Sequence, residues 1–230
     1  MNFIRKIYRE KDIKKIQSQI DMLGKTKWNA IKFMNYRLLT TIIFALFIII
    51  FTNLGYIVIP FLIILYYYLF YYLVITRPIK QRIEKLDKEA LYFFEVLTLT
   101  LESGRNLENS IGLTVMNIDS ELSYEFKKSL NEVKYGKSFM EALEDLKKRI
   151  PSETINNIIL NITQTSVFGN SIIDTMNNQI EFLRDKHLLE IKGKINKIPN
   201  KVSIVSVIFI IPLILLLILG PVLIQFLMKG

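Results

Sequence analysis

Apolar residues along the chain form long uninterrupted runs and short helical stripes. Residues 38–76 contain no Asp, Glu, Lys, Arg or His, and neither do residues 202–228. A helix needs about 20 apolar residues to cross the hydrocarbon core of a bilayer, which is roughly 30 Å thick. The second run therefore predicts one membrane-spanning helix at 203–227. The first run predicts two, at 38–52 and 56–76, joined by a turn at "TNLG".

Between these runs, apolar residues recur three or four positions apart, which is the spacing of amphipathic helices. They form six stripes separated by turn signals, and no alternating strand pattern competes with them. Three similar turn sequences, "SGRNLENSI", "YGKSFMEAL" and "FGNSIIDTM", have their glycines 32 and 33 residues apart. We therefore expect three helix–turn–helix hairpins, with the last helix running on toward a hinge at Pro199 and the third span.

Each turn sequence combines the end of one helix with the start of the next. Gly104, Gly136 and Gly169 are expected to end helices, because glycine readily takes the left-handed conformation found just after a helix. Ser138 and Ser171 are expected to begin helices, since each lies three positions before an acidic residue, as in a capping box. We interpret these five residues as structural caps, because none lies in a phosphate-binding glycine motif.

Hairpins at a constant interval are typical of either a short solenoid or a closed bundle. The Trp, Tyr and Pro positions of a tetratricopeptide repeat are missing, and apolar runs flank the hairpins on both sides, so we favour the bundle. The expected fold is all-α, with three transmembrane helices and a six-helix antiparallel cytoplasmic bundle. Its parts are a basic N-terminal segment (1–37), a transmembrane hairpin (38–76), the bundle (77–201), and the third span with a short outer tail (202–230).

Charge predicts how these parts are oriented. The 230-residue chain has a net charge of +9, but residues 87–190 carry 17 acidic and 11 basic side chains, a net of −6, which leaves +15 for the rest. Lys and Arg next to membrane spans mark the cytoplasmic side. We therefore expect residues 1–37 and 77–201 in the cytoplasm and the C-terminus outside. Membrane topology and anionic lipid account for the positive charge, so no nucleic-acid partner is predicted.

The sequence carries no enzyme signature. It has no cysteine and a single histidine, His187, in the charged stretch "RDKHLLE", and it contains neither HExxH nor GxSxG. No cofactor or metal site is predicted. The spans as predicted contain no ionisable residue, which argues against a proton-coupled carrier or an ion pathway. We expect a protein that is not an enzyme.

The order of these parts resembles the type II secretion F-domain family of membrane platform proteins. The stretches "LTLTLESGRNLENSI", "EVKYGKSFMEALEDLKKRIP" and "NITQTSVFGNSIIDTMNNQIEFLRDKHLLE" are similar to three successive motifs of that family. The resemblance covers about residues 85–228. Full-length type II and type IVa members have two bundles, whereas this chain has one. In this it resembles the tight-adherence (Tad, Flp) pilus proteins, and its ending "FIIPLILLLILGPVLIQF" is closer to their C-type than to their B-type.

The resemblance implies a function and a set of partners. It implies an inner, or cytoplasmic, membrane platform that couples a secretion ATPase to the assembly of pilin subunits, together with a paralogous platform protein in a homo- or hetero-oligomer. Arg149 and Arg184 match arginines of the family pattern and are candidates for contacts with the ATPase, the alternative for each being a local salt bridge. Two other functions stay open: a membrane-anchored adaptor whose bundle binds another cytosolic protein, and a small transporter or channel.

Overall fold

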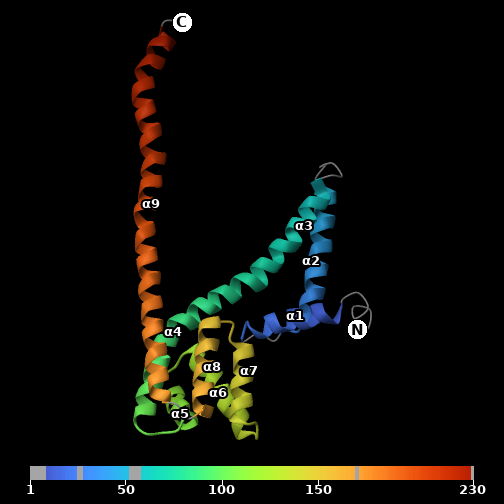
Figure 1. Ribbon diagram of the computed structural model, residues 1–230. Coiled ribbons are helices and arrows are strands. Elements are labelled where there is room, and N and C mark those ends of the chain that lie inside the picture. Colours follow the sequence, from blue (N-terminus) through green and yellow to red (C-terminus); the bar gives the residue numbers. More distant parts are fainter. Residues whose placement is uncertain (1–8, 25–27, 52–57, 169–170, 229–230) are drawn as a thin grey trace. The chain divides into compact units, whose positions relative to one another are not determined.

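The computed structural model describes residues 9–24, 28–51, 58–168 and 171–228. Every regular element within these ranges is a helix, so the predicted all-α class is confirmed for the described residues (Figure 1). Residues 1–180 and 181–230 form two compact units, and each is described by itself below.

The predicted hairpin consists of two apolar helices in contact, but its first helix begins earlier than expected. α2 (Ala30–Phe51) begins eight residues before the uncharged run, because no helix-breaking residue separates the two, and α3 (Val58–Tyr71) packs against it. The rings of Phe44 and Tyr66 stack between them, with centroids 4.2 Å apart. The "TNLG" turn lies outside the described residues.

α2 therefore also carries two basic residues, which the predicted span at 38–52 leaves out. Lys32 is exposed, whereas Arg37 is 94% buried. The guanidinium of Arg37 lies 4.0 Å from the centroid of the Tyr67 ring and donates a hydrogen bond to the Tyr67 hydroxyl. This cation–π contact and this hydrogen bond offset part of the cost of removing the charge from water.

No loop separates α3 from the helix that follows it. A π-helical turn, η2 (Tyr72–Thr76), leads directly into α4 (Arg77–Glu102), so helix runs without interruption from Val58 to Glu102. Pro78, at the start of α4, gives the physical reason for the turn. Proline has no N–H for the carbonyl four residues earlier and its ring crowds that carbonyl, and a wider π turn accommodates both effects.

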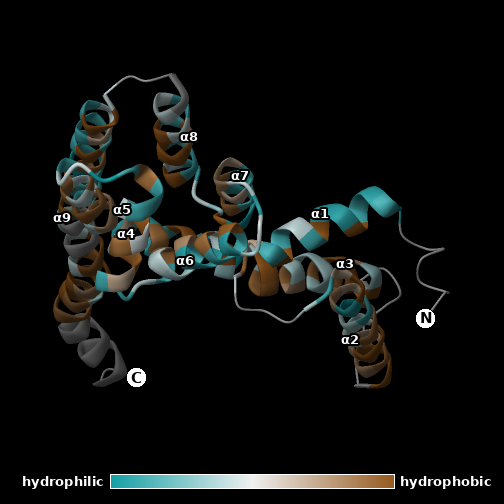
Figure 2. Cartoon of the chain, turned by 90° about the horizontal axis from the view of Figure 1, so that it is seen from below, coloured by the Kyte–Doolittle hydropathy of each residue, from teal (hydrophilic) through white to brown (hydrophobic). Residues whose placement is uncertain are grey.

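The N-terminal segment contains a helix that the sequence analysis does not predict. α1 (Glu10–Asp21) has Ile13, Ile16 and Ile20 on one face, at helical spacing. This face packs against the base of the hairpin, and the buried side chains form one apolar cluster of Ile16, Ile20, Ala30, Phe33, Met34 and Ile75. Figure 2 shows the mostly hydrophilic α1 beside the hydrophobic α2.

The expected stripes of the bundle segment each become a helix. After α4 come α5 (Leu107–Asn117), α6 (Glu121–Lys134), α7 (Phe139–Arg149), α8 (Glu153–Phe168) and α9 (Ile172–Met228). Phe93 and Phe126 stack across α4 and α6 with their centroids 4.7 Å apart, and Phe94 packs edge-on to both. The first and third hairpins also touch, because α4 contacts α8. Such a contact favours a closed bundle over a linear stack of repeats. A closed six-helix bundle stays a prediction.

Turn geometry at the helix ends follows the residue chemistry. Gly104 and Gly136 have φ angles of +83° and +99°, in the left-handed region that glycine adopts without strain. The Ser138 hydroxyl accepts from the Glu141 N–H at 3.2 Å, and the Ser138 N–H donates to the Glu141 carboxylate at 3.3 Å, which is a complete capping box. The Ser171 hydroxyl accepts from the Asp174 N–H at 3.3 Å. Gly169 lies outside the described residues.

α9 is a single helix of 57 residues that passes through Pro199 without a break. It contains the apolar stretch Ser203–Leu219, which overlaps the predicted third span. Within the described residues two helical stretches, Ala30–Ile50 and Ile59–Glu102, are long and apolar enough to cross a membrane. A third span at 203–227 stays a prediction.

Candidate functional site: a charged cleft beside α6 and α7

The site begins with one helix face that mixes apolar and charged residues. In α6, Leu122, Glu125, Phe126 and Ser129 lie at positions i, i+3, i+4 and i+7 and are all buried. Glu125 is 3% exposed. A carboxylate this deeply buried keeps its charge only if cations and hydrogen-bond donors replace the lost water.

Arg82 supplies one of these cations and connects three parts of the chain. It extends from α4 and is 6% exposed. Its Nε and Nη2 donate to Glu121 and Glu125 at 2.6 Å each. Its Nη1 donates to two backbone carbonyls, that of Met22 after α1 at 2.6 Å and that of Arg149 at the end of α7 at 2.9 Å. One guanidinium therefore joins α4 and α6 to the C-terminal ends of α1 and α7.

Gly24 makes this close approach to Arg82 feasible. It has a φ of +82°, and a Cβ built on it would lie 2.9 Å from both Cζ and Nη2 of Arg82. A side chain here would both strain the backbone and press on a buried guanidinium. Glycine is therefore the residue that suits this position.

Arg149 supplies the second cation for Glu125. Its Nε donates to Glu125 at 3.2 Å, its Nη1 to Glu132 at 2.9 Å, and its Nη2 to the Ser129 hydroxyl at 2.6 Å. All three guanidinium nitrogens are thus engaged with α6. Separating Arg149 from Glu125 would leave a buried charge without its partner. The ion pairs therefore favour one fixed arrangement of α6 and α7.

A second layer of ion pairs surrounds the turn between α6 and α7. Lys137 bridges Glu132 at 3.1 Å and also contacts Asp145, and Lys148 pairs with Asp145 at 2.7 Å. Hydrogen bonds from Lys137 and Lys148 lower the pKa of Asp145 from 3.8 to about 2, and the bonds to Asp145 and Glu132 raise the pKa of Lys137. Burial raises the pKa of Glu121, but hydrogen bonds from Arg82 and Lys85 outweigh it, so the net shift is downward.

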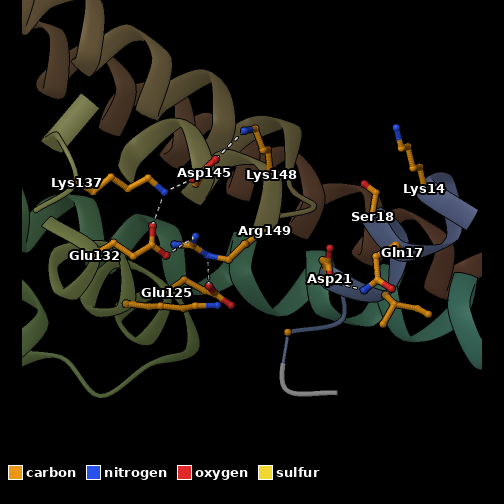
Figure 3. Close-up of a pocket in the computed structure, with 13 residues that line it drawn as sticks. Lys14, Gln17, Ser18, Asp21, Glu125, Glu132, Lys137, Asp145, Lys148 and Arg149 are labelled. Atoms are coloured by element: carbon orange, nitrogen blue, oxygen red, sulfur yellow. Dashed lines mark hydrogen bonds and ion pairs between the residues drawn. The ribbon is translucent and has the colours of Figure 1, made fainter. Parts of the chain in front are cut away.

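These groups line one wall of an open cleft of about 660 Å³ (Figure 3). The other wall is α1 with the turn that follows it. Figure 3 shows the α1 side chains across the cleft from the paired charges of α6 and α7. The bundle wall consists of Glu125, Lys128, Glu132, Lys137, Asp145, Lys148 and Arg149, and the α1 wall includes Lys14, Gln17, Ser18, Asp21 and Gly24.

Comparison with known proteins places the bundle in a family. Residues 93–220, more than half of the chain, match the family described as type II secretion system (T2SS), protein F. The chain belongs to the T2SS protein F family. No curated protein and no solved structure matches the chain.

The protein F match covers only one wall of the cleft. It begins within α4 at Phe93 and includes α6, α7 and most of α9. Arg82, α1 and the hairpin of α2 and α3 precede it. The charged cleft therefore lies where the protein F domain meets a part of the chain outside the match.

The two arginines predicted as partner contacts of this protein F domain differ in surroundings. Arg149 forms the local salt bridges described above, with its side chain 14% exposed. Arg184 is exposed on α9. The structure does not bring the two together in one described unit, and the role of either in binding a partner stays a prediction.

Sequence reasoning missed Arg82 and Glu125 as members of this site. Arg82 follows the hairpin and resembles the other basic residues near a membrane boundary, yet it lies four positions before Leu86, on the apolar face of α4. Glu125 likewise interrupts the apolar stripe of α6. A single charge on an otherwise apolar helix face was the available signal.

Within the described residues, no group of three His, Cys, Asp or Glu side chains lies close enough to hold a metal ion. The cleft carboxylates of the bundle are instead bound by arginine and lysine. In this protein F domain the charges hold helices together.

Proposed function

We propose that this chain is the inner-membrane platform protein of a type IV-like pilus or type II secretion-like machine. Membership of the protein F family indicates a platform protein of this general kind. The specific proposal is that its bundle receives movement from a cytoplasmic secretion ATPase and passes it to membrane helices that contact pilin subunits. In this role it needs no catalytic activity of its own.

The observation that carries the proposal is the unbroken helix from Val58 to Glu102. Its apolar first part is long enough to cross a membrane, and its second part supplies the buried core residues Leu86, Ala90 and Phe93 of the bundle. A flexible linker would absorb a displacement of the bundle, whereas a continuous helix transmits it. This arrangement suits a protein that moves its membrane helices in response to a cytoplasmic motor.

The contact between Arg82 and the Met22 carbonyl supports the proposed topology. These residues lie before and after the hairpin, and they meet at 2.6 Å, so an even number of crossings must separate them. Together with the basic residues near both ends of the hairpin, this favours a cytoplasmic N-terminus and a cytoplasmic bundle. The C-terminus would then lie outside, after the third span.

The tight-adherence subtype is the finer part of the proposal. A single bundle behind an N-terminal hairpin, and the Pro- and Gly-containing ending of α9, support the C-type Tad or Flp protein. The expected partners are the ATPase, pilin and a paralogous platform protein. The alternative function, a membrane adaptor, differs in that its bundle would bind an unrelated cytosolic protein.

Site-specific photo-crosslinking in intact membranes tests the function. A photoreactive residue at Tyr135, 91% exposed beside the α6–α7 turn, is expected to capture the secretion ATPase. One at Phe209, 72% exposed in the apolar part of α9, is expected to capture pilin or the paralogous platform protein. Each position serves as the control for the other. Capture of only unrelated cytosolic proteins at Tyr135, with ATPase and pilin present, would refute the platform function and favour the adaptor.

A further inference from the structure

Arg37, on α2, is a buried cation that no carboxylate of the described residues balances. It is 6% exposed, as deeply buried as Arg82. Arg82 pairs with two carboxylates, whereas Arg37 forms no ion pair within the part of the chain that the structure describes. Residues 38–76, which make up most of the hairpin, contain no Asp or Glu. Aromatic contacts offset only part of the cost of burying a charge, so an anion from outside the chain would stabilise this arginine.

The guanidinium of Arg37 also has donors left over. Its Nη2 donates to the Tyr67 hydroxyl. Its Nε is buried and has no hydrogen-bond partner. Its Nη1 likewise has no partner among the described residues, but it is not enclosed as Nε is. The chain by itself therefore leaves much of the hydrogen-bonding capacity of this buried arginine unused.

Tyr67 adds a second unused donor beside the first. Its hydroxyl accepts from Arg37, so its own proton is left for another bond, and no acceptor for it lies among the described residues. The hydroxyl of Tyr71, one helical turn later, instead donates to Gln19. Tyr67 is only partly buried, so the pair is open to its surroundings. A guanidinium and a hydroxyl that both have a proton to donate suit one oxyanion.

The position of Arg37 along α2 indicates which anions are near. From residue 38 to Phe51, α2 has 14 residues, which extend about 21 Å. With Phe51 at the outer edge of a hydrocarbon core roughly 30 Å thick, Arg37 lies ~9 Å inside the cytoplasmic edge in the proposed topology. Lipid phosphates reach an arginine at this depth because its side chain is long and the bilayer thins around it.

The surroundings favour a lipid over an acidic group of another protein. Arg77 and Lys80, at the cytoplasmic end of the hairpin, are exposed and attract anionic lipid. Basic pockets between membrane helices on the cytoplasmic side are a usual place for anionic headgroups. A carboxylate on a partner helix would have to be inserted at the same depth, which is costly before the pair forms.

We propose that Arg37 and Tyr67 bind the phosphate of one anionic phospholipid of the cytoplasmic leaflet. Phosphate oxygens accept from Nη1 of Arg37 and from the Tyr67 hydroxyl, and the acyl chains lie along the apolar surface of α2 and α3. The lipid supplies the counterion that the hairpin lacks and fixes the depth of the hairpin in the bilayer. This inference rests on the proposed membrane topology and not on the ATPase or pilin.

Native mass spectrometry tests the site with the full-length protein, freed of lipid in a neutral detergent. The probes are phosphatidylglycerol and phosphatidylcholine with identical acyl chains. We expect one phosphatidylglycerol to be retained in preference to phosphatidylcholine, whose choline adds a second positive charge beside Arg37. Arg37→Gln and Tyr67→Phe should each weaken phosphatidylglycerol binding about tenfold, as expected for the loss of a charge-assisted hydrogen bond. Arg37→Lys should be intermediate, since a point charge replaces a planar fork of donors.

Matched variants separate this site from general attraction to anionic lipid. Tyr68→Phe removes the hydroxyl of a neighbour that is 69% exposed, and should leave binding unchanged. Lys32→Gln removes an exposed cation of the same helix, and should weaken binding far less than Arg37→Gln. Circular dichroism checks that each variant keeps its helices. Equal retention of the two lipids, or phosphatidylglycerol binding that survives both Arg37→Gln and Tyr67→Phe, would overturn the proposal.

Two further probes separate a lipid from other anions. Millimolar inorganic phosphate should not displace phosphatidylglycerol, and displacement would assign the site to free phosphate instead. A polyleucine membrane helix with one Glu at the depth of Arg37 should bind the protein in phosphatidylcholine liposomes no better than the same helix with Gln. A preference for Glu that Arg37→Gln abolishes would assign Arg37 to a partner chain. Neither ATPase nor pilin is present, so the lipid site and the platform function fail independently.

Discussion

Arg82 shows at the level of one residue how a buried charge becomes a joint. Its donors engage two carboxylates and two helix-terminal carbonyls, so both the charge and the hydrogen-bonding capacity are satisfied. The acceptors belong to α6 and to the ends of α1 and α7. An apolar side chain has no donor for these four acceptors and no charge to balance the two carboxylates, so it could not replace Arg82.

Arg82→Gln should therefore be strongly destabilising. It leaves Glu125 buried with one cation fewer, and breaking one side of a buried ion pair costs about 3–5 kcal/mol of unfolding free energy. The control Lys85→Gln removes a cation that pairs with Glu121 but is 59% exposed, and should cost about 0–1 kcal/mol. Denaturant titration in detergent micelles measures both. Equal losses in the two variants would contradict the burial argument.

Two glycines allow the effect of backbone conformation on stability to be measured without a steric clash of the added side chain. A Cβ added to either Gly136 or Gly112 would have no neighbouring atom within 4 Å, but Gly136 has a φ of +99° and Gly112 lies inside α5. Gly136→Ala should destabilise by about 1–2 kcal/mol through the left-handed backbone, whereas Gly112→Ala should stabilise by about 1 kcal/mol through helix propensity. Thermal unfolding of both variants checks the signs. A bundle that melts normally with Gly136→Val would refute the helix-ending role of this glycine.

At the scale of elements, the hairpin of α6 and α7 is held by charge as well as by apolar packing. In the turn between them, Gly136 follows the end of α6 and Ser138 caps the start of α7. Lys137 contacts a carboxylate on each helix, Glu132 and Asp145. The turn residue thus ties the two helices together across their junction.

This arrangement predicts a dependence of stability on pH. The pKa of Asp145 is about 2 in the folded protein and 3.8 ordinarily, so the folded state favours its ionised form. Its contribution to stability is complete above the ordinary pKa and is lost as pH falls from about 4 to about 2. Wild type should be more stable than Asp145→Asn at pH 7, and the difference should shrink over that interval.

The control for this pH effect is Asp119→Asn, which alters an exposed carboxylate that forms no ion pair among the described residues. It should change stability little at any pH. A stability difference between wild type and Asp145→Asn that persisted unchanged to pH 2 would contradict the assignment.

The helix ends were predictable from sequence where neighbouring residues determine them. Features that depend on contacts with distant segments were less predictable. Capping residues such as Ser138 and left-handed glycines such as Gly136 act within a few positions, so the turn sequences located the helix ends of the bundle. α1 was missed because its three isoleucines lie in a short, strongly basic stretch. Arg82 was missed because its acceptors come from residues as far away as Met22 and Arg149.

For the whole molecule, the testable property is its orientation in the membrane. Ser103 is exposed in the turn between α4 and α5, and the proposed topology places it in the cytoplasm. A cysteine at this position should react with a membrane-impermeant maleimide in inverted vesicles but not in intact cells. Gly230→Cys should show the opposite pattern. Labelling of Ser103→Cys in intact cells would require the reverse orientation.

The joint at Arg82 also sets an order of events during synthesis. The Met22 carbonyl leaves the ribosome before either helix of the hairpin, Arg82 follows the hairpin, and Arg149 comes last. In the proposed topology, the joint closes only after both helices of the hairpin have been inserted, so α1 must wait while most of the bundle is made. A chain whose hairpin inserted only once would keep Met22 and Arg82 on opposite sides of the bilayer. In that topology, formation of this one contact reports that both helices of the hairpin were inserted.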